Sequence, residues 1–594
     1  MIMSANSAKQ GNYRNFMLTT YFVAHGTAHT TREQLEKDLS FFEKHMRLDK
    51  IYLEPFRAEQ ASHEQVEMCK QVFQAHGIQV EGGLTTVIRT PEGAEPKARL
   101  FDTFCYNDPA MRARLKEVSR FLGEHYDAFI IDDFFFTDCA CETCIRERDQ
   151  FNASHGIEDG SWQAYRLDLL RRVSEEDIIG PARAANPEIK ITIKYPNWAE
   201  SYQETGYNPA DQRRLFDRIY TGTETRDPVA QDQHLPRYLS YSLMTYFENM
   251  WPGHNGGGWF DNFDLHITEH YLEQAYLTAF SKPKELMLFC FQSLTDHPLA
   301  ASLGWHLDHL DDVLDYAGNP VGIPCYLPDN CQGEDNLQDF LGMCGLPVVC
   351  TPYFPEDATQ MILTRSSACD PEIVEKLDRY LREKGGDVLV TSGFIAATED
   401  RGIHRITSIR LRGRQVIADR WRVESADSPS CVFPYGDHPI AMPVVEFRNN
   451  ATWAVVKGEH GEESFAVLLR DSYGKGRMWT LTAPGAFPDF YAFPEAAWNR
   501  IRQAFPVAGL WLEGAPRVSL FPYDNDAFIL YPYVMEKNQF TRVRMHVRGA
   551  AALENPLARH AARKRIDPLY IQNGEAVFDL PARPGDYTIY RILR

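Results

Sequence analysis

The sequence predicts an α/β protein with an N-terminal (β/α)₈ TIM barrel, a small α/β domain and a C-terminal antiparallel β domain. The chain has 594 residues, which is too long for one hydrophobic core. Its first part alternates short apolar runs with longer amphipathic stretches, and this pattern changes near residue 317 and again near residue 400. We therefore expect a barrel over 1–317, an α/β domain over 318–400 and β-rich structure over 401–594.

Eight apolar runs in the first part predict the eight parallel strands that close a TIM barrel. In chain order they are residues 16–23, 50–55, 79–84, 128–134, 190–195, 218–223, 257–261 and 286–291. The stretches between them have helical periodicity, and many begin with acidic or polar residues. This regular alternation of strand and helix is what the barrel prediction rests on.

Beyond the barrel, apolar runs at 321–327, 347–350 and 387–391 predict buried strands beside a charged helix at 371–384. After residue 400 the runs alternate apolar and polar residues and are separated by Gly, Asn and Asp. They cover residues 444–447, 452–456, 464–469, 477–482 and 527–533. Such alternation is typical of half-buried antiparallel strands, and we expect sandwich domains there.

Composition and charge limit the partners and the compartment. The formal net charge is −20, which opposes binding to nucleic acid or to an anionic membrane, because both present dense negative charge. The sequence starts without the apolar core of a signal peptide, and no run of about 18 apolar residues follows. We expect a cytoplasmic protein that binds neither nucleic acid nor membranes and uses no organic cofactor.

Three of the twelve cysteines, Cys139, Cys141 and Cys144, form a C-x-C-x-x-C cluster just after the fourth predicted strand. Three thiolates at this spacing can share one cation, and Cys105 in the preceding loop can complete a tetrahedral set. The cluster predicts a structural Zn²⁺ site in a reducing compartment. The alternative is a group of buried thiols without metal.

Acidic residues at strand ends carry the predicted chemistry. Asp132 and Asp133 end the apolar fourth strand, and Glu224 ends the sixth with Arg226 nearby. In a TIM barrel such carboxylates face the open mouth, and glycoside cleavage needs two of them, one acid and one nucleophile or base. One of the two aspartates could instead cap the N-terminus of a helix or form a hydrogen bond that positions another side chain. Glu224 could be a structural ion-pair partner of Arg226. Asp261, at the end of the seventh strand, competes with Glu224.

Other polar and aromatic residues follow the same strand ends and are candidates for sugar binding. Lys194 and Tyr195 end the fifth strand, Glu54 lies at the end of the second, Trp259 lies in the seventh, and Arg226 follows the sixth. Flat rings can stack on sugar faces, but aromatic residues also fill cores. We rank Lys194, Glu54 and Trp259 above the other two.

Three segments, residues 104–109 (Phe-Cys-Tyr-Asn-Asp-Pro), 131–133 (Ile-Asp-Asp) and 139–144, occur in the same order as in the β-galactosidases of glycoside hydrolase family 42. The sequence resembles that family. The resemblance implies that Cys105 and the three clustered cysteines bind structural zinc, that Asp132 and Asp133 replace an Asn-Glu pair whose Glu is the acid/base, and that Asp261 is the nucleophile. The Asp at 133 is one methylene shorter than that Glu.

The resemblance extends beyond the barrel. Residues 319–393 look like the amidotransferase-like trimerisation domain of that family, which implies a homo-trimer. From residues and resemblance together we predict a retaining, exo-acting glycosidase with a carbohydrate substrate, Asp133 as acid/base and Glu224, slightly ahead of Asp261, as nucleophile. Two other hypotheses are a barrel that binds sugar without cleaving it and a carboxylate-dependent enzyme acting on a sugar acid.

Overall fold

The structure is a computed structural model that describes residues 11–88, 99–158, 160–426, 430–534 and 541–594. The chain divides into two compact units. The first comprises Met1–His234 and Met250–Asp311, and the second comprises Leu235–Asn249 and Asp312–Arg594. Among the described residues no helix has the length and apolar character needed to cross a bilayer.

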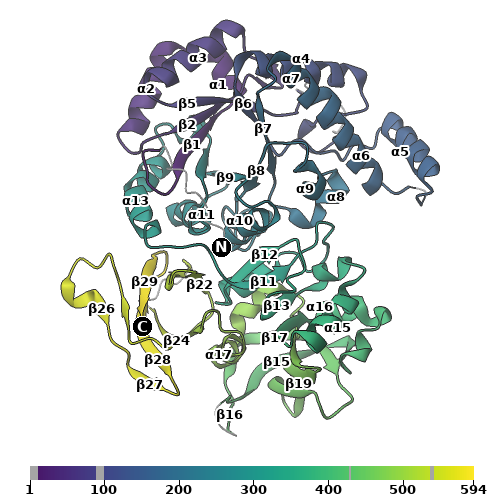
Figure 1. Ribbon diagram of the computed structural model, residues 1–594, viewed down its shortest axis with the longest axis vertical. Helices are drawn as coiled ribbons and strands as arrows, with labels where there is room; N and C mark the ends of the chain where they lie inside the picture. Colours follow the sequence, from purple (N-terminus) through teal and green to yellow (C-terminus); the bar gives the residue numbers. More distant parts are fainter. Residues whose placement is uncertain (1–10, 89–98, 159, 427–429, 535–540) are drawn as a thin grey trace. The chain divides into compact units, whose positions relative to one another are not determined.

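The first unit contains a closed barrel of eight parallel strands (Figure 1). Around the barrel the order is β1-β10-β9-β8-β7-β6-β5-β2, and β2 pairs with β1 to close it. The strands are β1 (Met17–Phe22), β2 (Lys50–Leu53), β5 (Gln79–Leu84), β6 (Ala128–Ile131), β7 (Lys190–Tyr195), β8 (Arg218–Gly222), β9 (Asn255–Asp261) and β10 (Glu285–Phe289). All eight predicted strands are confirmed, with ends that differ by up to three residues.

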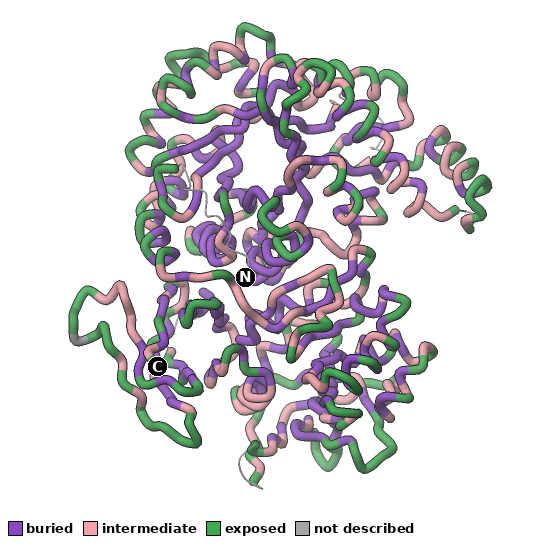
Figure 2. Tube along the Cα trace, viewed as in Figure 1, coloured by how far each residue is buried: buried purple, intermediate pink, exposed green. Residues whose placement is uncertain are grey.

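Amphipathic helices surround these strands and shield them from water. They include α2 (Arg32–Glu43), α3 (His63–Ala75), α4 (Pro109–His125) and α6 (Gln163–Val173). In α3 the buried residues Val66, Cys69, Val72 and Phe73 recur every three or four positions and form one apolar face. The strands are buried while the outer helix faces are exposed (Figure 2). The barrel is therefore a packed core whose chemistry is confined to its rim.

A mixed sheet dominates the second unit. Parallel strands β12 (Val348–Thr351), β11 (Ile323–Tyr326), β13 (Gln360–Leu363) and β14 (Asp387–Thr391) are joined by β20 (Gly476–Leu481), which pairs parallel with β14. Antiparallel strands β19 (Glu463–Tyr473), β18 (Trp453–His460) and β15 (Arg410–Glu424) continue the sheet, which also includes β16 (Cys431–Val432) and β17 (Tyr435–Glu446). The predicted helix is confirmed as α15 (Ile373–Glu383).

The predicted boundary at residue 400 was wrong, because it falls inside this one sheet. Four of the runs assigned to a separate sandwich belong to β17, β18, β19 and β20. Alternating apolar residues mark a strand with one buried face but do not say which sheet it joins. Here the join is made by β20, whose Arg477 pairs with Asp387 on β14 through two bonds of 2.6 Å.

The C-terminal segment forms two antiparallel sheets, as predicted for this end of the chain. One contains β21 (Leu510–Glu513), β24 (Thr541–Arg548), β28 (Glu575–Ala582) and β27 (Tyr570–Gln572). The other contains β22 (Val518–Tyr523), β23 (Ala527–Pro532), β29 (Thr588–Leu593), β25 (Ala552–Glu554) and β26 (Arg565–Ile566). Leu512 and Phe578 of the first sheet share one apolar core with Phe528 and Tyr590 of the second.

Candidate active site

Charged side chains from four barrel strands converge at the carboxyl ends of those strands. Lys194 is the fifth residue of β7, Asp132 and Asp133 directly follow β6, and Glu224 lies two residues beyond β8. Glu54 directly follows β2. Parallel strands bring their carboxyl ends to one rim, so residues far apart in sequence become neighbours there.

Lys194 is the centre of this cluster. Its Nζ lies 2.5 Å from Asp133 Oδ2 and 2.7 Å from Glu224 Oε1, and 3.7 Å from Asp132 Oδ1. The ammonium also lies 4.3 Å from the ring centroid of Trp259, a cation–π contact. Only 2% of the Lys194 side chain is exposed, so its charge is balanced by carboxylates rather than by water.

A second cation, Arg57, holds the other side of the cluster. Its Nη2 donates to Asp132 Oδ2 at 2.7 Å, and its Nε donates to Glu54 Oε2 at 2.9 Å. Thr85 donates to both Glu54 and Asp132, and the hydroxyl of Tyr21 donates to Glu54 Oε1 at 2.7 Å. Asp132 and Glu54 are thus fixed by ion pairs and hydrogen bonds, as buried carboxylates require.

Burial and neighbouring charges separate the protonation states of the two adjacent aspartates. Burial, together with the nearby Asp132 and Glu224 carboxylates, raises the pKa of Asp133 to about 8 against the lowering effect of Lys194. For Asp132 burial acts in the same direction, but Lys194 and Arg57 outweigh it and the pKa is lowered. Burial also raises the pKa of Glu224. Carboxyl groups held in different protonation states are what acid–base catalysis uses.

Asp261 and Arg226 form a separate pair beside the Lys194 cluster. Arg226 donates through Nε and Nη2 to both oxygens of Asp261, at 2.9 and 2.7 Å. The coulombic effect of Asp261 contributes to the raised pKa of Glu224, which places the pair close to the cluster. The sequence hypothesis that Arg226 pairs with Glu224 therefore gives way to Arg226 paired with Asp261.

The predicted sugar-binding residues divide into two groups. Lys194, Glu54 and Trp259 lie in or against the charged cluster. Tyr195 lies apart from it: the next residue along a strand points to the opposite side. Its hydroxyl donates to Gln212 Oε1 at 3.0 Å, and its ring packs against Tyr202.

Sequence reasoning missed Arg57 and Thr85. Arg57 lies on a short hairpin of β3 (Phe56–Arg57) and β4 (Glu59–Gln60), three residues after Glu54. Thr85 directly follows β5. The spacing of Glu54 and Arg57 was visible in the sequence, but an i,i+3 ion pair is common and by itself does not indicate a site.

The four predicted cysteines are brought together. The Sγ atoms of Cys105, Cys139, Cys141 and Cys144 all lie within 4.8 Å of one another. Cys105 Sγ is 3.6 Å from Cys144 Sγ and 3.9 Å from Cys141 Sγ. All twelve cysteines of the chain lie in the described part and are free thiols, so these contacts are not disulfides. Four clustered, largely buried thiols could hold a metal ion such as zinc.

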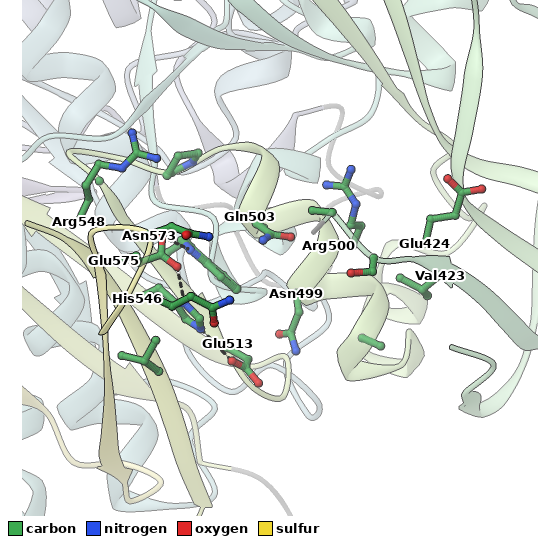
Figure 3. A pocket seen from close by; sticks show the side chains of 18 of the residues that line it. Val423, Glu424, Asn499, Arg500, Gln503, Glu513, His546, Arg548, Asn573 and Glu575 are labelled. Carbon is green, nitrogen blue, oxygen red and sulfur yellow. Dashed lines mark hydrogen bonds and ion pairs between the residues drawn. The ribbon is translucent and has the colours of Figure 1, made fainter. Parts of the chain in front are cut away.

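A cavity of about 810 Å³ lies in the second unit and is lined by β21, β24, β27, β28 and α17 (Glu495–Ala504). Figure 3 shows His546 between two carboxylates, with Nε2 2.8 Å from Glu513 and Nδ1 2.7 Å from Glu575. The residues that line this cavity all belong to the second unit, and the buried His546 imidazole and the two carboxylates pair with one another. The barrel carboxylates remain the better candidate for chemistry.

Comparison with known proteins finds one relative that matches most of the chain. Residues 318–485 match the second domain of the uncharacterized protein SSO3021. The whole SSO3021 protein of Saccharolobus solfataricus is 24% identical over 528 residues, 82% of this chain and 86% of that protein.

Two solved structures have a similar fold. A β-galactosidase from Bacillus circulans sp. alkalophilus covers 98% of this chain and 99% of its own, with a TM-score of 0.58 and 11% identity. The exo-β-1,4-mannosidase Op5Man5 from Opitutaceae bacterium strain TAV5 covers 84% and 99%, with a TM-score of 0.52 and 12% identity. The resemblance found in the sequence is confirmed at the level of a distant glycosyl hydrolase. Residues 5–316 match the family described as "Probable glycosyl hydrolase, catalytic domain", and the chain belongs to that family.

Proposed function

We propose that the barrel is a retaining, exo-acting glycosidase with Asp133 as acid/base and Glu224 as nucleophile. The shared contact with Lys194 carries the proposal. Because Asp133 Oδ2 and Glu224 Oε1 lie 2.5 and 2.7 Å from the same nitrogen, they can be no farther apart than the sum of those distances. A limit of this size is near the spacing of about 5–5.5 Å between the carboxyl groups of retaining enzymes, and it supports a retaining mechanism over an inverting one, whose carboxyl groups lie roughly 6.5–9.5 Å apart.

The two carboxyl groups suit different roles. With its pKa raised to about 8, Asp133 keeps a proton at neutral pH and can deliver it to the leaving oxygen. Asp133 is also the more exposed of the two, at 15% of its side chain against 6% for Glu224. Lys194 favours the ionised form of Glu224, which a nucleophile needs. Arg57 and Thr85 hold Asp132 and so support the backbone from which Asp133 projects.

Asp261 remains the alternative nucleophile that the family resemblance nominates. Both of its oxygens accept from Arg226, which lowers their reactivity and leaves Glu224 ahead. The two candidates predict different inactive variants, so the choice can be made by experiment.

The substrate class follows from the family, and the exo mode is inferred from similar folds. A glycosyl hydrolase acts on a carbohydrate. One of the two structures of similar fold is named an exo-mannosidase and the other a β-galactosidase, which supports removal of a terminal sugar. The homo-trimer, the amidotransferase-like character of residues 319–393 and the cytoplasmic location stay predictions from the sequence.

The cysteine cluster is proposed to hold structural zinc. A tetrahedral ion with Zn–S bonds of about 2.3 Å places its sulfur atoms about 3.8 Å apart. The observed separations of 3.6 and 3.9 Å fit this geometry. Asn107 Nδ2 also donates to Cys144 Sγ at 3.1 Å, as expected for a group that stabilises a metal-bound thiolate.

The decisive experiment is a screen of aryl α- and β-glycosides with wild type, Asp133→Ala, Glu224→Ala and Asp261→Asn. Added azide reports the role of each residue. An acid/base variant yields a glycosyl azide with the anomeric configuration of the substrate, whereas a nucleophile variant yields the opposite configuration. Glu176→Gln, an exposed carboxylate that pairs with Arg112, is the matched control and should keep full activity.

Several results would contradict the proposal. Inversion of configuration by wild type would exclude a retaining mechanism. A wild type that binds sugars but releases no aglycone would favour the non-hydrolytic barrel. Release of a product without a reducing end would favour an enzyme acting on a sugar acid.

A further inference from the structure

Two histidines and a glutamate meet on the rim of the barrel, outside the carboxylate cluster. His25 and His29 lie on α1 (Ala24–His29), which follows β1, and Glu59 begins β4 of the short hairpin. Residues four apart on a helix present their side chains on the same face. The two imidazoles accordingly lie with ring centroids 4.6 Å apart.

The three side chains direct their ligand atoms at one another. Glu59 Oε1 is 2.8 Å from His25 Nδ1, and Glu59 Oε2 is 3.0 Å from His29 Nε2. These ligand atoms all lie within 4.8 Å of one another. The side chains are 77%, 59% and 36% exposed for His25, His29 and Glu59, so an ion can reach them from solvent.

We propose that His25, His29 and Glu59 form a binding site for a divalent transition-metal ion of the zinc class. Two imidazoles and one carboxylate are a ligand set that zinc accepts, and a coordination position is left for solvent. Imidazole selects zinc and its neighbours over Mg²⁺ and Ca²⁺, which prefer oxygen ligands. The site is distinct from the four cysteines and does not depend on the proposed glycosidase activity.

The place of the site in the fold gives the ion a structural role. Glu59 is the cross-strand partner of Arg57, and the two are joined by Ala58, whose φ of 57° is unusual for a residue other than glycine. Arg57 reaches from this hairpin to Glu54 and Asp132. An ion bound to Glu59 and to α1 would tie the hairpin to the rim and restrain the residue that holds Asp132.

The same chain offers a matched control. His63, Glu67 and His125 form a second group of two histidines and one glutamate with ligand atoms within 4.8 Å. There the ammonium of Lys70 lies 3.0 Å from Glu67 Oε1 and competes with any cation for that carboxylate. We therefore expect tight binding at the first group and not at the second.

The experiment counts zinc in the full-length chain. Wild type, a His25→Ala/His29→Ala double variant and a His63→Ala/His125→Ala double variant are stripped with chelator and dialysed against buffered Zn²⁺. Wild type and the His63/His125 variant should retain one more equivalent per chain than the His25/His29 variant. Equal zinc content in all three proteins would overturn the site. Circular dichroism confirms that each variant is folded.

Hydrogen exchange tests the structural role separately. Zn²⁺ should slow amide exchange in residues 54–61 of wild type and leave it unchanged in the His25→Ala/His29→Ala variant. Glu59→Gln, which keeps both imidazoles, should weaken zinc binding by at least tenfold. Exchange that does not respond to Zn²⁺ in wild type would overturn the restraint of the hairpin. These readouts use no substrate, so they are independent of whether the barrel hydrolyses glycosides.

Discussion

Lys194 Nζ donates to Asp133 Oδ2 at 2.5 Å, although the two residues lie 61 positions apart in the sequence. The contact joins the ends of two adjacent barrel strands, and the same ammonium also binds Glu224. One buried cation thus contacts both the proposed acid and the proposed nucleophile. The predictions below test what this arrangement does.

The rate of hydrolysis should fall as pH rises through about 8. Asp133 acts only when protonated, and its pKa is raised to about 8 by burial and by the nearby carboxylates. The fall in rate at low pH reports the protonation of Glu224. Because burial raises the pKa of Glu224, the midpoint of that fall should lie above the ordinary glutamate value of about 4.3. The measurement is kcat/KM against pH. A rate that stays constant from pH 6 to 10 would exclude Asp133 as the acid.

Asp133 should also make folding stability depend on pH. Its pKa is about 8 in the folded state and about 3.9 when unfolded, so the folded state holds an extra proton between these values. The contribution of Asp133 to the free energy of unfolding is fully present below pH 4. It is lost as pH rises toward 8, at up to about 1.4 kcal/mol per pH unit. Asp133→Asn should therefore gain stability relative to wild type as pH rises, in urea titrations at pH 5 and 8. A constant difference would show that Asp133 titrates normally.

Replacing Lys194 by Met should shift both limbs of the pH profile upward. The ammonium lowers the pKa values of Asp133 and Glu224, so its removal raises both. We expect kcat to drop by roughly 10²–10³, the usual cost of losing one preorganised charge in a dry site. Lys194→Arg is the control because it keeps the charge and should keep the position of the limbs. Similar profiles for Met and Arg variants would mean that the charge is unimportant.

Arg57→Met should destabilise the barrel by about 3–5 kcal/mol, the typical effect of removing one partner from a buried ion pair. The substitution leaves Glu54 buried without its cation and leaves Asp132 with only Lys194, whose Nζ is 3.7 Å away. The free energy of unfolding in urea measures the effect. Arg47→Met, which removes an exposed ion pair with Asp308, is the control and should change stability by less than about 1 kcal/mol. Equal losses in both variants would contradict the assigned role of Arg57.

Cys144→Ser should lower the tightly held zinc of the purified protein by one equivalent per chain. It removes one of four ligands and leaves an incomplete tetrahedral set. Elemental analysis after dialysis should find one equivalent less zinc in the variant than in wild type. Cys69→Ser, a buried cysteine of α3 outside the cluster, should keep it. Zinc content unaffected by Cys144→Ser would favour the reading of these cysteines as metal-free thiols.

The sequence alone determined the barrel, because hydrophobic periodicity is local and each of the eight runs carried its own signal. It also determined the four clustered cysteines, three of which lie within residues 139–144. It could not place β20 beside β14, because the choice of a strand's neighbour depends on contacts between distant segments. The expected boundary at residue 400 failed for that reason.

Tertiary structure decided how the charges pair. In the sequence Glu224 lies near Arg226, but in the fold Arg226 pairs with Asp261, and Lys194 pairs with Glu224. It also brings Arg57, which local spacing did not single out, against Asp132. Side chains at a barrel rim meet across strands far apart in sequence, so their partners and protonation states are set only when the barrel closes.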